Sequence, residues 1–294
     1  MALKLLIKYT FIFVTLAMAG CVNNHSTPKA KVAEMTEAER NTYNMCKYWQ
    51  EFDFNDTTWL SHKKELEQVF AVWVEGVLKA YYESDTILSW DPIKRASVSE
   101  PMLSRFMSMA DECFRNPISP WRCEELYIPM LETALATDKA SEEDKLRWED
   151  RLAKALMNRQ GTIATDFEFV TMSGKTNTLH NINATYTLLY FFNPGCHDCE
   201  RVSQVIEDSP VVEALIDCDK LKVAAIYPDE DLGEWNKLPR RAINGWTIGR
   251  ITDEAEREKY DLPAIPNLYL LDKDKSVIIK DGTIEEIIFA LQNM

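Results

Sequence analysis

The chain has 294 residues, 46% of them hydrophobic, and its 33 basic and 47 acidic residues give a formal net charge of −14. A chain of this length and apolar content fits about two folded domains and is not disordered throughout. The negative charge argues against binding to the phosphate backbone of a nucleic acid, and seven cysteines in so long a chain do not form a disulfide scaffold.

The N-terminus has the pattern of an exported protein. A short basic start precedes an apolar run that is too short for a typical membrane span, and Ala19 and Gly20 come directly before Cys21. This pattern resembles a bacterial lipoprotein signal over residues 1–20, which implies a lipid on Cys21. The polar residues 21–35 would then be a tether in the cell envelope, facing the periplasm, with the inner or outer membrane left open. The alternative is an ordinary signal or anchor with a chance cysteine.

Residues 36–159 have a helical pattern. Thr36 and Glu39 form a capping-box pair, and the apolar side chains between Lys63 and Glu83 recur every three or four residues. Those apolar residues are Leu66, Val69, Phe70, Trp73, Val74, Val77 and Tyr81. Helices are also expected to start at Asp91-Pro92 and at Ser119-Pro120. Helical patterns over 121–137 and 141–158 complete the set. The region is therefore expected to be a body of about four to six packed helices.

Tryptophans are frequent in this helical region. We expect Trp49, Trp59, Trp73 and Trp90 to fill its core rather than to bind a cofactor, and no cofactor is predicted. The region resembles an uncharacterised domain that precedes thioredoxin-like domains in lipoproteins of anaerobic Gram-negative bacteria. The segments that carry this likeness are 52–57, 119–122 and 125–127. The resemblance implies no particular chemistry.

Residues 160–294 alternate between strand and helix patterns. Phe167 and Phe169 flank Glu168, as in a half-buried strand. Apolar runs that predict strands lie at 185–192, 221–227, 267–271 and 276–280, the last two forming a hairpin. A capping box at residues 283–286 begins a C-terminal helix. Together these patterns predict an α/β sandwich after an all-helical domain.

The motif Cys196-His197-Asp198-Cys199 directly follows the buried run 185–192. A helical pattern begins at these cysteines, and the unpaired amides and dipole of a first helical turn favour an anion. Cys196 is therefore predicted to be the nucleophilic thiolate, and Cys199 to close a disulfide with it. A zinc half-site or two unrelated core cysteines are the alternatives. No metal is expected, because structural zinc usually takes four ligands and the sequence has no second C-x-x-C and no H-x-x-H pair.

The order of elements in this half, with its C-x-x-C helix and a later Ile-Pro before a strand, resembles a thioredoxin fold of the TlpA/ResA-type branch. The matching segments are Asp166-Phe167, Ser173-Gly174-Lys175, 191–199 and 260–266. The resemblance implies a thiol–disulfide oxidoreductase with a cis peptide bond before Pro266. It also implies that Pro266 faces the dithiol and that the Ile265 backbone is free to pair with an extended substrate segment. A plain trans proline is the alternative.

The chain departs from the family pattern in two ways. Asn193-Pro194-Gly195 stands where a tryptophan is frequent, and residues 185–192 lack the buried acid that many thioredoxins use as a proton relay. The base is therefore unassigned, with Glu168 and Asp198 as candidates and a surface position as the alternative for each. A protonated His197 would stabilise a thiolate, whereas Asp198 would oppose one.

The other cysteines are expected to be structural. Cys113 and Cys123, ten residues apart across two prolines, can form a structural disulfide in an oxidising compartment, although spacing alone does not supply the required Cα separation. Cys46 and Cys218 are expected to be small buried apolar residues.

These observations predict an exported, membrane-anchored thiol–disulfide oxidoreductase that works as a reductant. Its partners would be protein thiols or disulfides, an upstream redox protein and, through Cys21, a lipid membrane. One alternative is a thiol peroxidase, although the Pro-x-x-x-Thr-x-x-Cys positions before Cys196 hold Leu189 and Asn193. The other is a partner-binding lipoprotein whose helical domain recognises the partner, with redox activity secondary.

Overall fold

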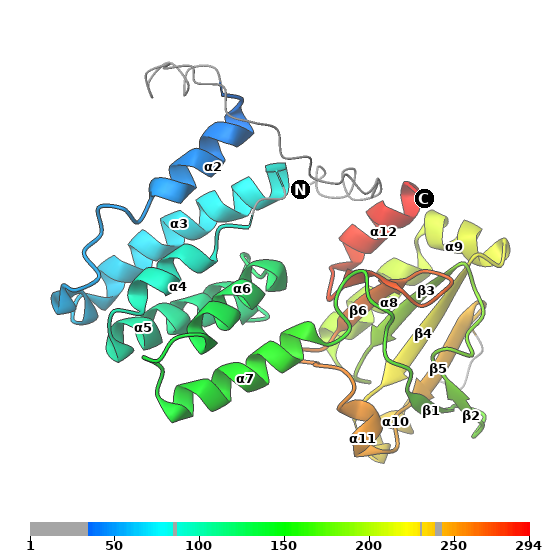
Figure 1. Ribbon diagram of the computed structural model, residues 1–294. Helices are drawn as coiled ribbons and strands as arrows, with labels where there is room; N and C mark the ends of the chain where they lie inside the picture. Colours follow the sequence, from blue (N-terminus) through cyan, green and yellow to red (C-terminus); the bar gives the residue numbers. More distant parts are fainter. Residues whose placement is uncertain (1–34, 85–86, 230, 239–242) are drawn as a thin grey trace. The chain divides into compact units, whose positions relative to one another are not determined.

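The computed structural model describes residues 35–84, 87–229, 231–238 and 243–294. The chain divides between Ala153 and Lys154 into two compact units, a helical one followed by one built on a mixed β-sheet (Figure 1). This confirms the predicted fold class. The expected signal at residues 1–20, Cys21 and almost all of the expected tether at 21–35 lie outside the described residues.

The first unit consists of helices joined by short connections. They are α2 (Glu37–Lys47), the 3₁₀-helix η1 (Thr57–Leu60), α3 (Lys63–Ser84), α4 (Trp90–Ala96), α5 (Glu100–Ala110), the π-helix η2 (Asp111–Arg115), α6 (Glu124–Leu135) and α7 (Glu142–Leu156). The capping box is confirmed: the Thr36 side chain accepts from the Glu39 amide, and the Glu39 carboxylate accepts from the Thr36 amide. The apolar stripe of α3 faces inward as predicted, with Val69 only partly buried.

Aromatic side chains form the centre of the helical unit. Trp49 is 1% exposed and its ring contacts six others, which are Tyr48, Phe52, Phe54, Phe70, Trp73 and Phe106. Trp73 is buried as well, and Trp59 packs against the core from its edge. Three of the four tryptophans assigned to the core are therefore in it or against it, and the structure does not describe the side chain of the fourth, Trp90.

The helix start expected at Ser119-Pro120 is wrong by several residues. The Ser119 hydroxyl donates to the Cys113 carbonyl at 2.6 Å, and the Cys123 amide donates to the Phe114 carbonyl at 3.1 Å. These bonds hold the segment in turns against the end of η2, so that α6 begins only at Glu124. A serine followed by proline has the composition of a helix start, but here its hydroxyl is used in a longer-range contact.

The predicted disulfide between Cys113 and Cys123 is not formed in the part of the chain that the structure describes. Cys113 is a free thiol, 9% exposed and packed into the helical core, and burial raises its pKa to about 11. The loop is closed instead by the Ser119 hydroxyl bond to the Cys113 carbonyl and the Cys123 amide bond to the Phe114 carbonyl. The expected burial of Cys46 and Cys218 is also wrong, since both side chains are exposed.

The second unit is a seven-stranded sheet among the described residues, with strand order β2-β1-β5-β4-β3-β6-β7. The strands are β1 (Glu168–Thr171), β2 (Thr176–Thr178), β3 (Tyr186–Phe191), β4 (Leu221–Tyr227), β5 (Trp246–Arg250), β6 (Asn267–Leu271) and β7 (Val277–Lys280). The helices are α8 (His197–Glu207), α9 (Pro210–Asp217), α10 (Leu232–Trp235), α11 (Glu254–Arg257) and α12 (Ile284–Gln292). This is the order expected of a thioredoxin fold.

The central strand β3 is buried on both faces, as its apolar sequence predicts. It pairs in parallel with β4 and antiparallel with β6. Leu189 and Phe191 join a core cluster with Phe167 and Phe169 on one face of the sheet. Successive side chains of a strand alternate between faces, so Tyr190 points to the other face, toward α8. Helices α8, α9 and α12 pack against one another there (Figure 1).

The sequence did not predict β5, which joins the two halves of the sheet. It pairs in parallel with β4 and antiparallel with β1. Gly249 explains the weak pattern: a Cβ atom there would lie 2.3 Å from the Phe169 ring, so the strand needs a residue without a side chain at this point. A glycine in a short run lowers the strand signal even where packing demands it.

Candidate active site

The C-x-x-C motif lies where the chain leaves the central strand. Asn193-Pro194-Gly195 follows β3, and Gly195 has φ of +77°, a left-handed conformation that glycine adopts without strain. This turn leads directly into α8, so the motif lies at the N-terminus of that helix, just beyond the carboxyl end of the central strand β3. The local sequence therefore fixes the position of both cysteines.

Cys196 is the N-cap residue of α8. Its backbone is extended, with φ of −80° and ψ of 118°, and its sulfur accepts a hydrogen bond from the Cys199 amide at 3.4 Å. The side chain is partly exposed and both cysteines are free thiols. A thiolate at this position would face the unpaired amides and the positive end of the helix dipole. The geometry is that of a nucleophile open to solvent.

Cys199 lies one turn further along α8 and is only 2% exposed. Its sulfur accepts a hydrogen bond from the Asn193 amide at 3.4 Å. Burial, followed by the hydrogen bond with Cys196, raises the pKa of the Cys199 thiol to about 12. The structure therefore brings the two predicted sulfurs together, with one accessible and one held protonated beneath it.

Tyr190 is a site residue that sequence reasoning missed. Its side chain is completely buried, and its hydroxyl donates to the Cys199 carbonyl at 2.8 Å and lies 3.3 Å from the Ser203 hydroxyl. Burial raises the pKa of the Tyr190 phenol, so the group stays a neutral hydroxyl. Its position six residues before Cys196, on a strand whose alternate side chains face α8, is the signal that could have identified it.

The Ile265–Pro266 peptide bond is cis, as the resemblance implied. Phe191 pairs with Asn267 across β3 and β6, so Pro266 and the residue that follows β3 lie at the same end of the sheet. Ile265 is partly exposed, and no hydrogen bond from its backbone to the described part of the chain is present. This segment therefore runs beside the chain that leads into the dithiol.

A second residue that the sequence did not indicate is Glu234, on α10. A Cβ atom at Gly195 would lie 3.2 Å from Glu234 Oε2, so this carboxylate lies beside the turn that leads into the motif. Its side chain is 32% exposed and forms an ion pair with Lys237. Strands β3 and β4 are parallel, and their carboxyl ends share one edge of the sheet, which is why α10 reaches this turn.

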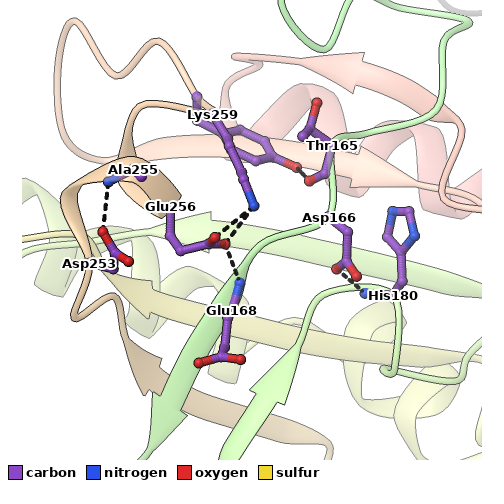
Figure 2. Close-up of polar contacts among 9 residues, drawn as sticks. Thr165, Asp166, Glu168, His180, Asp253, Ala255, Glu256 and Lys259 are labelled. Carbon is purple, nitrogen blue, oxygen red and sulfur yellow. Dashed lines mark hydrogen bonds and ion pairs between the residues drawn. The ribbon is translucent and has the colours of Figure 1, made fainter.

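The candidate base Glu168 is not at the dithiol. It is exposed on β1, and β5 and β4 separate that strand from β3. Figure 2 shows its backbone amide bonded to Glu256 Oε2, at 2.7 Å, with its own carboxylate turned away. Glu256 also forms an ion pair with Lys259. These contacts of Glu256 join the start of β1 to the segment of the short helix α11. The surface alternative therefore holds for Glu168.

His197 and Asp198 are both exposed in the first turn of α8.

Within the described ranges, no group of three or more His, Cys, Asp or Glu side chains could hold a metal ion. Over the same residues, the helices are each too short or too polar to cross a membrane.

Fold and site together define a two-unit protein. Its second unit is a thioredoxin fold with two thiols at the N-terminus of α8. A crystal structure of a thioredoxin-like protein from Bacteroides caccae is 31% identical in sequence, covers 96% of this chain and 99% of that one, and superposes with a TM-score of 0.80. The chain belongs to these thioredoxin-like proteins. The likeness spans both units and not the dithiol domain alone.

Other comparisons match one half of the chain. The family described as Domain of unknown function (DUF5106) matches residues 16–158. The C-terminal domain of an uncharacterised Bacteroides fragilis protein is 42% identical, covering 46% of this chain and 99% of its own, with a TM-score of 0.43. The thioredoxin domain of a Bacteroides vulgatus thiol–disulfide oxidoreductase is 16% identical, covering 46% of this chain and 96% of its own, with a TM-score of 0.40. No curated protein matches.

Proposed function

We propose that the protein is an exported, membrane-tethered thiol–disulfide oxidoreductase of the TlpA/ResA type, and that it reduces protein disulfides. The observation that carries the proposal is the unequal pair of sulfurs. Cys196 is partly exposed at a helix N-cap, whereas Cys199 is 2% exposed and bonded to the same turn. Such a pair separates an attacking thiolate from a resolving thiol.

The reaction takes place in two exchanges. The Cys196 thiolate attacks one sulfur of a substrate disulfide; a mixed disulfide forms, and the other substrate sulfur leaves as a thiolate that takes up a proton. Cys199 then loses its proton and attacks Cys196 Sγ, which releases the second substrate thiolate. Two electrons have passed to the substrate, and the Cys196–Cys199 disulfide is returned to dithiol by an upstream redox partner.

The segment before β6 supplies the surface for an extended substrate. Ile265 is partly exposed and lies at the sheet edge that carries the motif. Its free backbone groups could pair with a substrate strand next to Cys196, with Pro266 against the dithiol. Main-chain pairing of this kind tolerates many side chains, which suits an enzyme that acts on several proteins.

The direction of the reaction is measured by the reduction potential of the Cys196–Cys199 pair. A value near about −270 mV supports a reductant, and one near about −120 mV contradicts it. Consumption of peroxide at a rate above that of disulfide exchange would instead identify a thiol peroxidase.

Replacing Cys199 by serine is expected to stop the reaction at the mixed disulfide. The partly exposed Cys196 can still attack, but the attack that releases the substrate needs the second sulfur. Incubation with a protein disulfide should give a covalent adduct, seen by mass spectrometry and removed by a small thiol reductant. Cys218→Ser, which removes an exposed cysteine on the same unit, is the control and should give none. An adduct that dissociates as fast as that of the wild type would contradict the role of Cys199.

The lipid anchor is supported by the sequence Ala19-Gly20-Cys21. Cys21→Ser is expected to abolish incorporation of a labelled fatty acid and to move the protein from the membrane fraction to the soluble fraction of a Gram-negative host. Cys46→Ser, which leaves the proposed lipid site intact, is the matched control. Membrane association that survives in the Cys21 variant would contradict the anchor.

A further inference from the structure

Two hydrogen-bond donors lie near the buried sulfur of Cys199. The Asn193 amide donates to it at 3.4 Å. The Tyr190 hydroxyl donates to the carbonyl oxygen of the same residue at 2.8 Å and acts to lower the pKa of the Cys199 thiol. Both donors come from β3 or the residues directly after it, which are buried or partly buried. A thiolate formed at Cys199 would therefore have these two donors in place of water.

The Tyr190 hydroxyl is placed to change partners. In the dithiol state it donates to the Cys199 carbonyl at 2.8 Å, and the Ser203 hydroxyl lies 3.3 Å away. A phenol has one proton to donate and can accept two hydrogen bonds. If Ser203 donates to the tyrosine oxygen, the Tyr190 proton is available to either the carbonyl or the sulfur of Cys199.

No carboxylate on β3 can act on the Cys199 sulfur, because the strand contains no Asp or Glu. The titratable groups that act on Cys199 are Cys196 from α8 and Tyr190 from β3. Glu234 of α10 lies beside Gly195, and it is not among the groups that act on Cys199. In the mixed disulfide Cys196 no longer carries a proton or a charge. Among the described residues, Tyr190 is then the titratable side chain left to interact with the charge on Cys199.

We propose that Tyr190 is a catalytic hydrogen-bond donor for the second exchange, an inference that rests on the proposed function. As the Cys199 proton leaves to solvent, the Tyr190 O–H turns from the Cys199 carbonyl to its sulfur and, with the Asn193 amide, stabilises the thiolate. The thiolate attacks Cys196 Sγ, the bond between Cys196 and the substrate breaks, and the electron pair leaves with the substrate thiolate. The first exchange does not use Tyr190.

The aromatic disulfide dithiobis(nitrobenzoate) separates the two exchanges. Attack by Cys196 releases one coloured thiolate, and resolution by Cys199 releases a second. The signal of a Cys196→Ser/Cys199→Ser double variant gives the contribution of the remaining cysteines. With the reduced full-length protein, Tyr190→Phe is expected to leave the first phase unchanged and to slow the second about tenfold or more at neutral pH. The pH profile of the second phase should shift upward, because the thiolate forms less readily.

A matched control is Tyr260→Phe. Tyr260 is also a buried tyrosine of this unit whose hydroxyl donates to a backbone carbonyl, that of Thr165 at 2.8 Å, but it is not bonded to the dithiol. Both phases should keep their wild-type rates and pH profiles. Ser203→Ala, which removes the support for the Tyr190 hydroxyl and leaves the strand intact, should slow the second phase by a smaller factor.

The outcomes distinguish this inference from the proposed function. If the wild-type protein releases only one coloured thiolate above background, the proposed function fails and Tyr190 loses its role with it. If the wild type releases two and Tyr190→Phe has an unchanged second phase, only the role of Tyr190 is overturned. Equal slowing of both phases in Tyr190→Phe, or in Tyr260→Phe, would indicate a general structural effect and would also overturn it.

Discussion

Replacing Cys196 by serine is expected to abolish disulfide exchange. Cys196 is the partly exposed sulfur at the N-cap of α8, whereas Cys199 is 2% exposed and its burial raises the pKa of the thiol to about 12. A hydroxyl at position 196 is a far weaker nucleophile at neutral pH, and the buried thiol cannot take its place. Turnover of a protein disulfide should fall to the uncatalysed rate, measured by the precipitation of reduced insulin.

The controls for this experiment come from the same unit. Cys218→Ser removes an exposed thiol that lies outside the motif and should keep full activity. Circular dichroism should show Cys196→Ser folded, because the Cys196 sulfur makes one weak cap contact that a serine oxygen can replace. Full exchange activity in the Cys196 variant would refute the proposed mechanism, and the role of Cys199 as resolving thiol would fail with it.

Truncating Trp49 to alanine is expected to be the most destabilising single change in the helical unit. The side chain is 1% exposed and contacts six aromatic rings, so its loss should lower the free energy of unfolding by about 3–5 kcal/mol. Urea unfolding followed by far-ultraviolet circular dichroism would report the shift of the helical transition. Val72→Ala, at an exposed position of α3, should change the free energy by less than about 0.5 kcal/mol.

A second variant keeps the Trp49 prediction testable if the alanine form does not fold. The indole N–H is buried and has no hydrogen-bond partner among the described residues, so a phenylalanine loses ring volume but no hydrogen bond. Trp49→Phe should therefore be less destabilised than Trp49→Ala. Equal stability of the wild type and Trp49→Ala would show that this aromatic cluster does not hold the helical unit together.

Much of the fold follows from local signals that depend on few residues. The capping boxes at Thr36 and Thr283 mark the starts of α2 and α12, because each satisfies amides within the same four residues. The uninterrupted apolar run of β3 indicates a strand buried on both faces. The C-x-x-C motif after that strand places both sulfurs of the candidate site correctly, because the turn and the helix that hold them are adjacent in sequence.

The features that sequence missed depend on contacts between distant segments. Gly249 weakens the signal of β5 because Phe169, from another strand, fills the space of its side chain. Ser119 looks like a helix cap but bonds to the Cys113 carbonyl instead. Cys46 follows an apolar residue and Cys218 follows a helix, yet both side chains face outward. Tyr190 looks like one more core aromatic until the packing of α8 places its hydroxyl beside Cys199.

The unequal exposure of the two sulfurs also determines what a trapped intermediate would contain. Because Cys196 alone of the pair meets solvent, each client protein would be joined to the enzyme through that sulfur, and the covalent complexes would form a single regioisomer. Peptides released from such complexes would carry one fixed enzyme fragment as their partner, so that a uniform mass tag would mark the reactive cysteine of every client. The Cys199→Ser variant, expressed in its native host, would then identify the proteins that react with Cys196 and the cysteines through which they react.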